Sequence, residues 1–144
     1  MSTSSPSGNG PGVAERMGFQ NEMVVMEIGY DDDVDEELRG QIESHVGTGL
    51  VNEDSDEVID VVLLWYREDD GDLGDLLVDA IRPLADDGFI WLLTPKRGRD
   101  GYVEPSDIAE ASSVAGLSQT SITTAGTEWS AARLTSRKSM GAKR

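Results

Sequence analysis

The sequence contains no cysteine and only one histidine, His45. Without cysteine the chain can form no disulfide, no thiolate nucleophile and no cysteine-bound zinc or iron–sulfur centre. A single histidine gives little material for a Ser-His-Asp triad or for a metal site built from several histidines. We therefore predict no catalytic residues and no metal ligands, and we interpret His45 as an ordinary surface or boundary residue.

Long hydrophobic runs are also missing. The longest, such as VVLLW at residues 61–65, fall far short of the ~18 residues that a membrane-spanning helix needs. The opening MSTSSPSGNGPG has neither the basic start nor the apolar centre of a signal peptide. We expect a cytoplasmic protein that makes no contact with a membrane.

A chain of 144 residues has the size of one domain. The start, rich in Ser, Gly and Pro, predicts a flexible tail over residues 1–15. The basic end predicts a second tail over residues 138–144. The domain itself is expected between them, at residues 16–137.

Acidic residues outnumber basic ones by 28 to 12, which gives a net charge of −16. Between Glu27 and Asp87 the 21 acidic residues minus three basic ones leave a balance of −18. Such a surface repels nucleic-acid phosphates and anionic lipids, so we expect no direct nucleic-acid binding. It suits a protein partner with a basic surface, which includes the case of a chain that mimics nucleic acid.

The acidic runs also suggest calcium binding, but their spacing excludes an EF-hand. In an EF-hand loop, position six is Gly and position twelve is Glu. Counted from Asp31, these positions are Glu36 and Ile42. A solvated acidic face explains the runs better than a metal site does.

Apolar spacing predicts strands and helices that alternate along the chain. Apolar runs rich in β-branched residues indicate strands, and apolar residues that recur every three or four positions indicate helices. Two alternating segments at the end predict an antiparallel hairpin with its turn at Gly126 and Thr127. The expected strands are residues 23–29, 58–66, 89–95, 118–126 and 128–137, and the expected helices are residues 34–46, 73–84 and 104–116.

Local signals mark where these elements begin and end. Asp33 and Glu36 have the spacing of a capping box at the start of the first helix. Pro83 is expected to end the second helix, and ADDG at residues 85–88 predicts a turn. A very short strand is expected near Leu50 and Val51. The alternation predicts an α/β fold of three layers, with a mostly parallel, Rossmann-like sheet and a C-terminal antiparallel hairpin.

The order of elements from Val58 to Arg137 resembles the later part of the class I S-adenosylmethionine-dependent methyltransferase fold. The segments that carry this resemblance are VIDVVLLW, LLVDAIRPLADDG, FIWLLTP, PSDIAEASSVAG, SITTAG and EWSAARLTS. From Met17 on, the chain more narrowly resembles an uncharacterised family of high-GC Gram-positive bacteria, through VDVVLLWYR, PLADDGFIWLLTPK, PSDIAEA, AGLSQTS and WSAARL. The first resemblance implies S-adenosylmethionine as a cofactor, whereas the second carries no assigned activity.

The part of the chain that would bind this cofactor departs from the methyltransferase pattern. Only Glu27 and Gly29 match the glycine motif, and Tyr30, Asp31 and Asp32 stand where further glycines are expected. Fewer than thirty residues separate Gly29 from the strand at 58–66, where the full fold has two strands and two helices. The acidic residue that holds ribose in the family has no clear counterpart here, and Glu53 and Asp54 are the nearest acids to its position.

A ligand crevice is expected at the ends of neighbouring strands. Its candidate residues are Gly29, Tyr30, Trp65 and Tyr66, with Thr94 and Lys96 on the next strand. The cluster of Lys96, Arg97 and Arg99 either clamps an anion or counters nearby acids.

These observations favour a non-catalytic methyltransferase-like domain that binds a protein partner or a small ligand, with no cofactor expected. The alternatives are a methyltransferase with an altered glycine turn, which would use S-adenosylmethionine, and an acidic mimic of nucleic acid.

Overall fold

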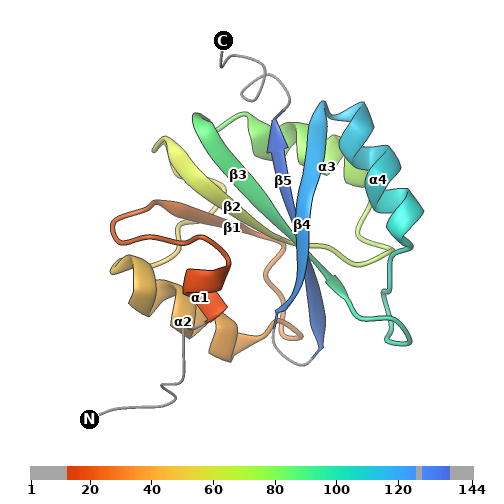
Figure 1. Cartoon of the computed structure of the whole chain (residues 1–144), viewed down its shortest axis with the longest axis horizontal. Coiled ribbons are helices and arrows are strands. Elements are labelled where there is room, and N and C mark those ends of the chain that lie inside the picture. The colour runs from red at the N-terminus through yellow and green to blue at the C-terminus, as the bar shows by residue number, and fades with distance from the viewer. Residues whose placement is uncertain (1–12, 126–127, 137–144) are drawn as a thin grey trace.

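The computed structural model describes residues 13–125 and 128–136. Residues 1–12 and 138–144 of the expected tails lie outside this part of the chain, as does the turn predicted at residues 126 and 127. Within the described residues, no helix is long and apolar enough to cross a membrane. The helices are α1 (Val13–Arg16), α2 (Glu36–Val46), α3 (Leu73–Ile81) and α4 (Pro105–Val114), and the strands are β1 (Val25–Ile28), β2 (Ile59–Trp65), β3 (Leu84–Pro95), β4 (Leu117–Ala125) and β5 (Trp129–Ser136) (Figure 1).

The five strands form one open sheet in the order β1-β2-β3-β5-β4. β1, β2 and β3 are parallel, whereas β5 pairs antiparallel with both β3 and β4. The sheet is therefore mixed, with the parallel strands first and an antiparallel hairpin last. The predicted α/β fold and its C-terminal hairpin are confirmed.

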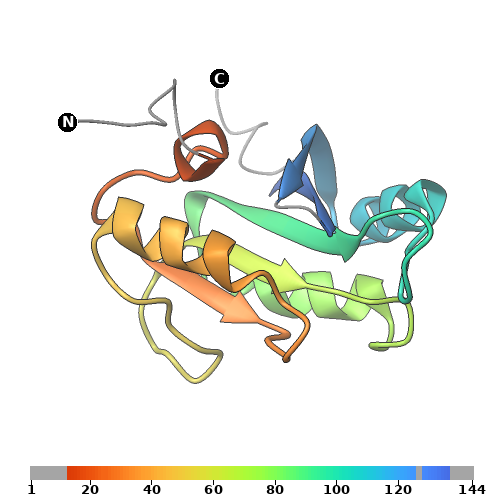
Figure 2. The ribbon, with the colours of Figure 1, turned by 90° about the horizontal axis from the view of Figure 1, so that it is seen from below.

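Helices cover both faces of the sheet, which gives the three predicted layers. α1 and α2 pack on one face, and α3 and α4 pack on the other (Figure 2). Because side chains alternate along a strand, neighbours in β2 belong to different cores. Leu63 and Trp65 pack toward α2, whereas Leu64 and Tyr66 pack toward α3 and α4.

α2 begins at a different aspartate from the one predicted. The carboxylate of Asp35 caps the helix by accepting a hydrogen bond from the amide of Leu38 at 2.9 Å. Asp33, the predicted cap, instead forms an ion pair with Arg67. The helix ends at Gly47, whose φ of 88° supplies the left-handed turn of a C-terminal cap.

The turn predicted at residues 85–88 is wrong, because β3 already begins at Leu84. Leu84 pairs with Ile59 and Phe89 pairs with Val61, so the intervening residues of β3 bulge out opposite a single residue of β2. Residues 85–88 thus belong to β3 without a partner on β2, and regular pairing resumes at Phe89.

The short strand predicted near Val51 is a single parallel bridge to Met26 on β1. The amide of Val51 donates to the carbonyl oxygen of Val25 at 2.9 Å, and the amide of Glu27 donates to the carbonyl oxygen of Val51 at 2.8 Å. Between β1 and β2 the described chain thus forms only α2 and this bridge. The cofactor-side half of the fold is short, as the sequence predicted.

Candidate functional site

β1 and β2 are parallel, so their carboxyl ends lie next to each other. Open α/β sheets bind their ligands at the carboxyl ends of their strands. The chain leaves β1 at Gly29, whose φ of 84° is a left-handed conformation that favours glycine. A β-carbon at this position would lie 2.2 Å from the carbonyl oxygen of Trp65. The glycine therefore lets the backbone after β1 pack directly against the backbone at the end of β2.

Arg67 fills the space beside this contact. Its Nη1 donates to the carbonyl oxygens of Gly29, at 2.9 Å, and Trp65, at 3.3 Å. Its Nε and Nη2 donate to the two carboxylate oxygens of Asp33 at 3.0 and 2.5 Å, and Nη1 also reaches Asp70 at 3.1 Å. Only 12% of the Arg67 side chain is exposed. Its hydrogen bonds join the segments that follow β1 and β2.

Two tryptophan rings complete this packing. The guanidinium of Arg67 lies 5.3 Å from the ring centre of Trp129, and the rings of Trp129 and Trp65 meet edge to face with centres 4.9 Å apart. Nε1 of Trp129 donates to the carbonyl oxygen of Asp33 at 3.2 Å, and Nε1 of Trp65 donates to the carboxylate of Glu27 at 2.8 Å. Arg67 and the two buried rings therefore occupy this part of the crevice.

Glu27, which matches the glycine motif, is held by other residues of the chain. Arg39 donates to its two carboxylate oxygens from Nε at 2.6 Å and from Nη2 at 2.8 Å. Only 8% of the Glu27 side chain is exposed. The hydrogen bonds from Arg39 to Glu27 raise the pKa of Arg39 above its ordinary value. Together with the Trp65 indole, three donors hold the carboxylate in a fixed position.

A hollow of about 560 Å³ opens beside this ion pair, next to β1. Tyr30 lies at its rim with the guanidinium of Arg39 4.6 Å from its ring centre. The Tyr30 hydroxyl donates to Glu36 at 2.6 Å, and this hydrogen bond raises the pKa of Tyr30. Gly29 and Glu53 also line the hollow. Glu53, one of the two acids nearest to the family's ribose-binding position, thus lies beside two predicted crevice residues.

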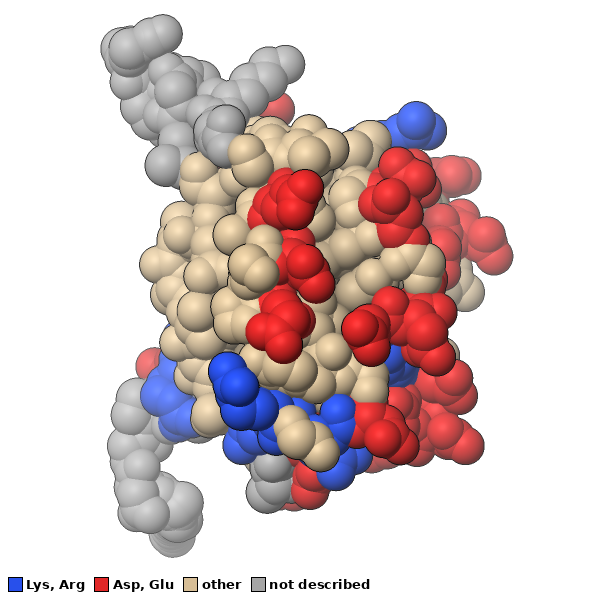
Figure 3. All heavy atoms as spheres, turned by 90° about the vertical axis from the view of Figure 1, so that its right-hand side faces the viewer, with Lys and Arg blue, Asp and Glu red and all other residues tan. Residues whose placement is uncertain are grey.

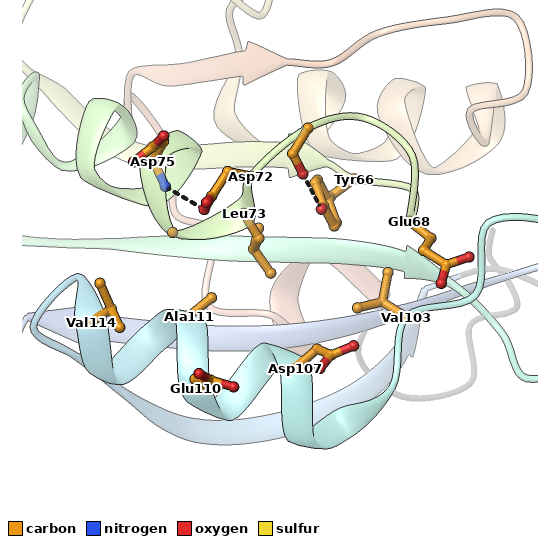
Figure 4. Close-up of a pocket in the computed structure, with 12 residues that line it drawn as sticks. Tyr66, Glu68, Asp72, Leu73, Asp75, Val103, Asp107, Glu110, Ala111 and Val114 are labelled. Carbon is orange, nitrogen blue, oxygen red and sulfur yellow. Dashed lines mark hydrogen bonds between the residues drawn. The ribbon is translucent and has the colours of Figure 1, made fainter.

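A second hollow, of about 380 Å³, lies between α3 and α4 on the other face of the sheet (Figure 4). The Tyr66 hydroxyl donates to the carbonyl oxygen of Gly71 at 2.5 Å beside it. Burial, followed by repulsion from neighbouring carboxylates, raises the pKa of Tyr66. The side chains of Leu73, Val103 and Ala111 point into the hollow (Figure 4). Its floor is therefore apolar.

Carboxylates flank this hollow on both sides. Asp72 and Asp75 lie on the α3 side, and Asp107 and Glu110 lie on the α4 side. Figure 3 shows acidic side chains in two rows on this side of the molecule, with uncharged surface between them. Across residues 13–125 and 128–136, no group of three or more side chains is placed to hold a metal ion. The result is a trench with an apolar floor and negative rims.

The basic cluster after β3 is partly engaged with its own surroundings. Arg99 forms an ion pair with Glu128, and the guanidinium of Arg97 lies 5.4 Å from the ring centre of Tyr102. The backbone amide of Lys96 donates to the carbonyl oxygen of Glu128 at 3.0 Å. Of these contacts, the ion pair of Arg99 with Glu128 matches the interpretation in which the cluster counters nearby acids.

The structure separates the six predicted crevice residues into different places. Gly29 and Tyr30 line the hollow beside β1, whereas Tyr66 lines the trench between α3 and α4. Trp65 and Thr94 are buried in the cores on either side of the β2 and β3 ends. The remaining candidate, Lys96, is half-buried just after β3.

Arg39 and Arg67, which organise the crevice, were not among the predicted site residues. They are two of only three basic residues between Glu27 and Asp87. This rarity was the available signal, because a cation in a segment of such negative charge is expected to have acidic partners. Which acids these are depends on contacts between residues far apart in the chain.

Several solved structures of similar fold are methyltransferases. A SAM-dependent methyltransferase from Aquifex aeolicus has a TM-score of 0.59 at 11% identity, with 85% of this chain and 86% of that chain covered. An O-methyltransferase from neocarzinostatin biosynthesis, in complex with S-adenosylhomocysteine and a naphthoic acid, has a TM-score of 0.66 at 10% identity. This second match covers 87% of the present chain but only 52% of the enzyme. At these identities the likeness concerns the fold alone.

Relatives with clear sequence similarity are mycobacterial. Uncharacterized protein Rv2239c from Mycobacterium tuberculosis and Uncharacterized protein Mb2263c from Mycobacterium bovis are each 52% identical over 131 residues. These residues cover 91% of this chain and 82% of each relative. The family model described as protein of unknown function (DUF3052) matches residues 14–138. The chain therefore belongs to the DUF3052 family and has a methyltransferase-like fold.

Proposed function

We propose that this chain is a non-catalytic, methyltransferase-like domain that acts by binding a protein partner. The observation that carries the proposal is the position of Arg67, which fills the crevice between the ends of β1 and β2. A ligand in this crevice would have to displace a guanidinium that is bonded to Asp33 and to the carbonyl oxygen of Gly29. Removing these contacts is costly, because the Arg67 side chain is only 12% exposed and its charge would lose its partners.

The backbone after β1 supports the same proposal. A glycine-rich turn binds a cofactor by letting it come close to the backbone. Here the side of Gly29 on which a side chain would stand faces the carbonyl oxygen of Trp65. The next residue is Tyr30, not a further glycine. The space that a glycine motif leaves for a ligand is thus taken by the neighbouring strand.

The second candidate function is an S-adenosylmethionine-dependent methyltransferase. The observation that favours it is the hollow beside β1, where Gly29, Tyr30 and Glu53 lie together. The similar O-methyltransferase from neocarzinostatin biosynthesis holds S-adenosylhomocysteine in its crystal structure. A ligand whose nucleoside part lay in this hollow could bind without full displacement of the Arg67 side chain from the crevice.

Titration calorimetry with S-adenosylmethionine and with S-adenosylhomocysteine separates the two functions. We expect no binding by the wild-type chain, and micromolar binding of either compound would overturn the proposal. Arg67→Ala empties the crevice, and Arg82→Ala, which removes an exposed cation at the end of α3, is its matched control. Binding by Arg67→Ala alone would show that Arg67 blocks a crevice that is otherwise competent.

The trench between α3 and α4 suits the partner of the non-catalytic function. Its apolar floor would bury one face of a partner segment, and its rims would attract basic side chains. Asp72 and Asp75 lie across the trench from Asp107 and Glu110, so a cationic segment would meet carboxylates on both sides. The partner segment expected here is amphipathic and basic.

A synthetic amphipathic peptide of lysine and leucine tests this surface. Asp107→Asn combined with Glu110→Gln should weaken its binding several-fold, because two rim charges are lost. Asp54→Asn combined with Asp56→Asn removes the same charge from the exposed loop before β2 and should change binding little. Equal losses in the two double variants would show only a general attraction to a chain of net charge −16, and would exclude the trench as a specific site.

A further inference from the structure

The two edges of the sheet differ in what covers them. At the β1 edge, Val51 forms backbone hydrogen bonds with Val25 and Glu27. At the other edge, β4 pairs with β5 alone among the residues that the structure describes. In an edge strand, alternate residues turn their backbone N–H and C=O groups outward. The outer side of β4 can therefore accept a further strand.

β4 lacks most of the features that prevent edge strands from pairing. Its sequence, LSQTSITTA, has no charged residue and no proline, although 28% of the chain is charged. Lysine, proline and bulges are the usual means of blocking an edge. β4 has a bulge between Gln119 and Ser121, but residues 121–125 pair one to one with β5. Within this regular part, Ile122 exposes 65% of its surface.

We propose that β4 is a self-association edge, at which two copies of the chain pair antiparallel through residues 121–125. A two-fold axis at Thr123 would place Thr123 opposite itself, Ser121 opposite Ala125, and Ile122 opposite Thr124 of the second copy. The two five-stranded sheets would then form one continuous sheet. Ile122, which is exposed in a single copy, would gain a cross-strand neighbour.

The charge distribution favours a second copy as the occupant. A two-fold pair brings two copies of the same strand together, so any charge on the strand would occur twice in the contact and repel its own copy. For a chain of net charge −16, association is easiest through a strand that carries no charge. The acidic rows lie at the centre and right of Figure 3. β4, at the front of Figure 1, lies toward the left of Figure 3, where the surface is mostly uncharged above the basic side chains at the lower left.

Analytical ultracentrifugation of the full chain over about 1 to 100 µM tests the proposal, because self-association depends on concentration. We expect a shift from 15.5 kDa toward twice this mass as concentration rises. Added salt should strengthen the dimer, since it screens repulsion between two acidic copies. A mass of 15.5 kDa throughout this range would overturn the proposal.

Two matched variants place the contact on β4. Ile122→Lys puts a charge on the exposed edge strand and should weaken dimerisation at least about tenfold. Val58→Lys makes the same change at a position that is 67% exposed and lies before β2, so it should leave the dimer intact. A dimer that resists Ile122→Lys would contradict pairing through β4.

Amide hydrogen exchange of the wild-type chain gives an independent readout. The outward amides of residues 121–125 should exchange more slowly at high than at low protein concentration. Dimerisation without this protection would contradict the proposal even if a variant failed to fold. The measurement needs no S-adenosylmethionine, so its result is separate from the test of the crevice.

Discussion

Nη1 of Arg67 donates a hydrogen bond to the carbonyl oxygen of Gly29 at 2.9 Å, across 38 positions of sequence. The side chain that follows β2 thereby closes the turn that follows β1. In a Rossmann-like sheet this turn is where the backbone approaches a cofactor. Here the backbone at this turn is approached by another part of the protein itself, the segment that follows β2.

Gly29→Ala should strongly destabilise the protein, by about 3 kcal/mol or more, because a new β-carbon would clash with backbone as well as adopt a strained φ. The clash is with the carbonyl oxygen of Trp65 at 2.2 Å. Gly98→Ala is the control, because Gly98 has a similar φ of 90° but no atom within 4 Å of the added carbon. It should cost only about 1 kcal/mol in urea denaturation. Similar losses in the two variants would contradict the close packing at Gly29.

Glu27→Gln should lower the free energy of unfolding by about 2 kcal/mol, because it removes the buried one of the two carboxylates that pair with Arg39. Arg39 donates to the two carboxylate oxygens at 2.6 and 2.8 Å, and the glutamine amide replaces one of these acceptors with an NH2 donor and removes the negative charge. Glu36→Gln removes the other carboxylate that pairs with Arg39, but the Glu36 side chain is 59% exposed. Its loss should cost well under about 1 kcal/mol. Equal effects in urea denaturation would show that burial does not strengthen the Glu27 pair.

Asp33 should stabilise the protein in a pH-dependent way. The hydrogen bond from Arg67 lowers the pKa of Asp33 below its ordinary value. A lowered folded-state pKa gives stability that is present above the unfolded pKa of about 3.9 and is lost as pH falls through the folded value. Asp33→Asn should therefore lower the urea midpoint near neutral pH, and this effect should shrink as the pH falls below about 3.9 toward the lower folded-state pKa.

The control for this pH dependence is Asp69→Asn, which removes a carboxylate from the exposed loop that follows Arg67. Its difference from the wild type should be small at every pH. An Asp33→Asn effect that stays constant from neutral to acidic pH would contradict stabilisation by the ion pair.

Asp35→Ala should cost about 1 kcal/mol, the usual value for an N-terminal cap. The carboxylate of Asp35 accepts the amide hydrogen of Leu38 at 2.9 Å, which satisfies a donor at the start of α2. Asp32→Ala removes an exposed acid outside the helix and should have a much smaller effect on the thermal midpoint. A greater loss from Asp32→Ala would contradict Asp35 as the cap.

The parts of the fold that were predicted from sequence depend on local patterns. Apolar runs located the strands, and Val34, Leu38, Ile42 and Val46 at intervals of four located α2. The position of its cap was missed by two residues, because Asp33 and Asp35 are equally good capping residues. Only Arg67, from beyond β2, decides that Asp33 pairs elsewhere.

The candidate site was less predictable for a related reason. Trp65 and Tyr66 are adjacent in sequence, yet the alternation of side chains along β2 sends them to opposite faces of the sheet. A shared crevice for both therefore could not form. The partners of Arg39 and Arg67 were equally hidden, because each joins residues on different elements.

The sequence by itself determined the alternation of strands and helices, the acidic surface and the short connection between the first two strands. These features follow from residue types and their spacing, which act locally. Only the tertiary structure decided that Arg67 fills the crevice and that Gly29 faces Trp65 rather than open space. Such contacts depend on which segments the folded sheet brings together, and spacing along the chain does not specify them.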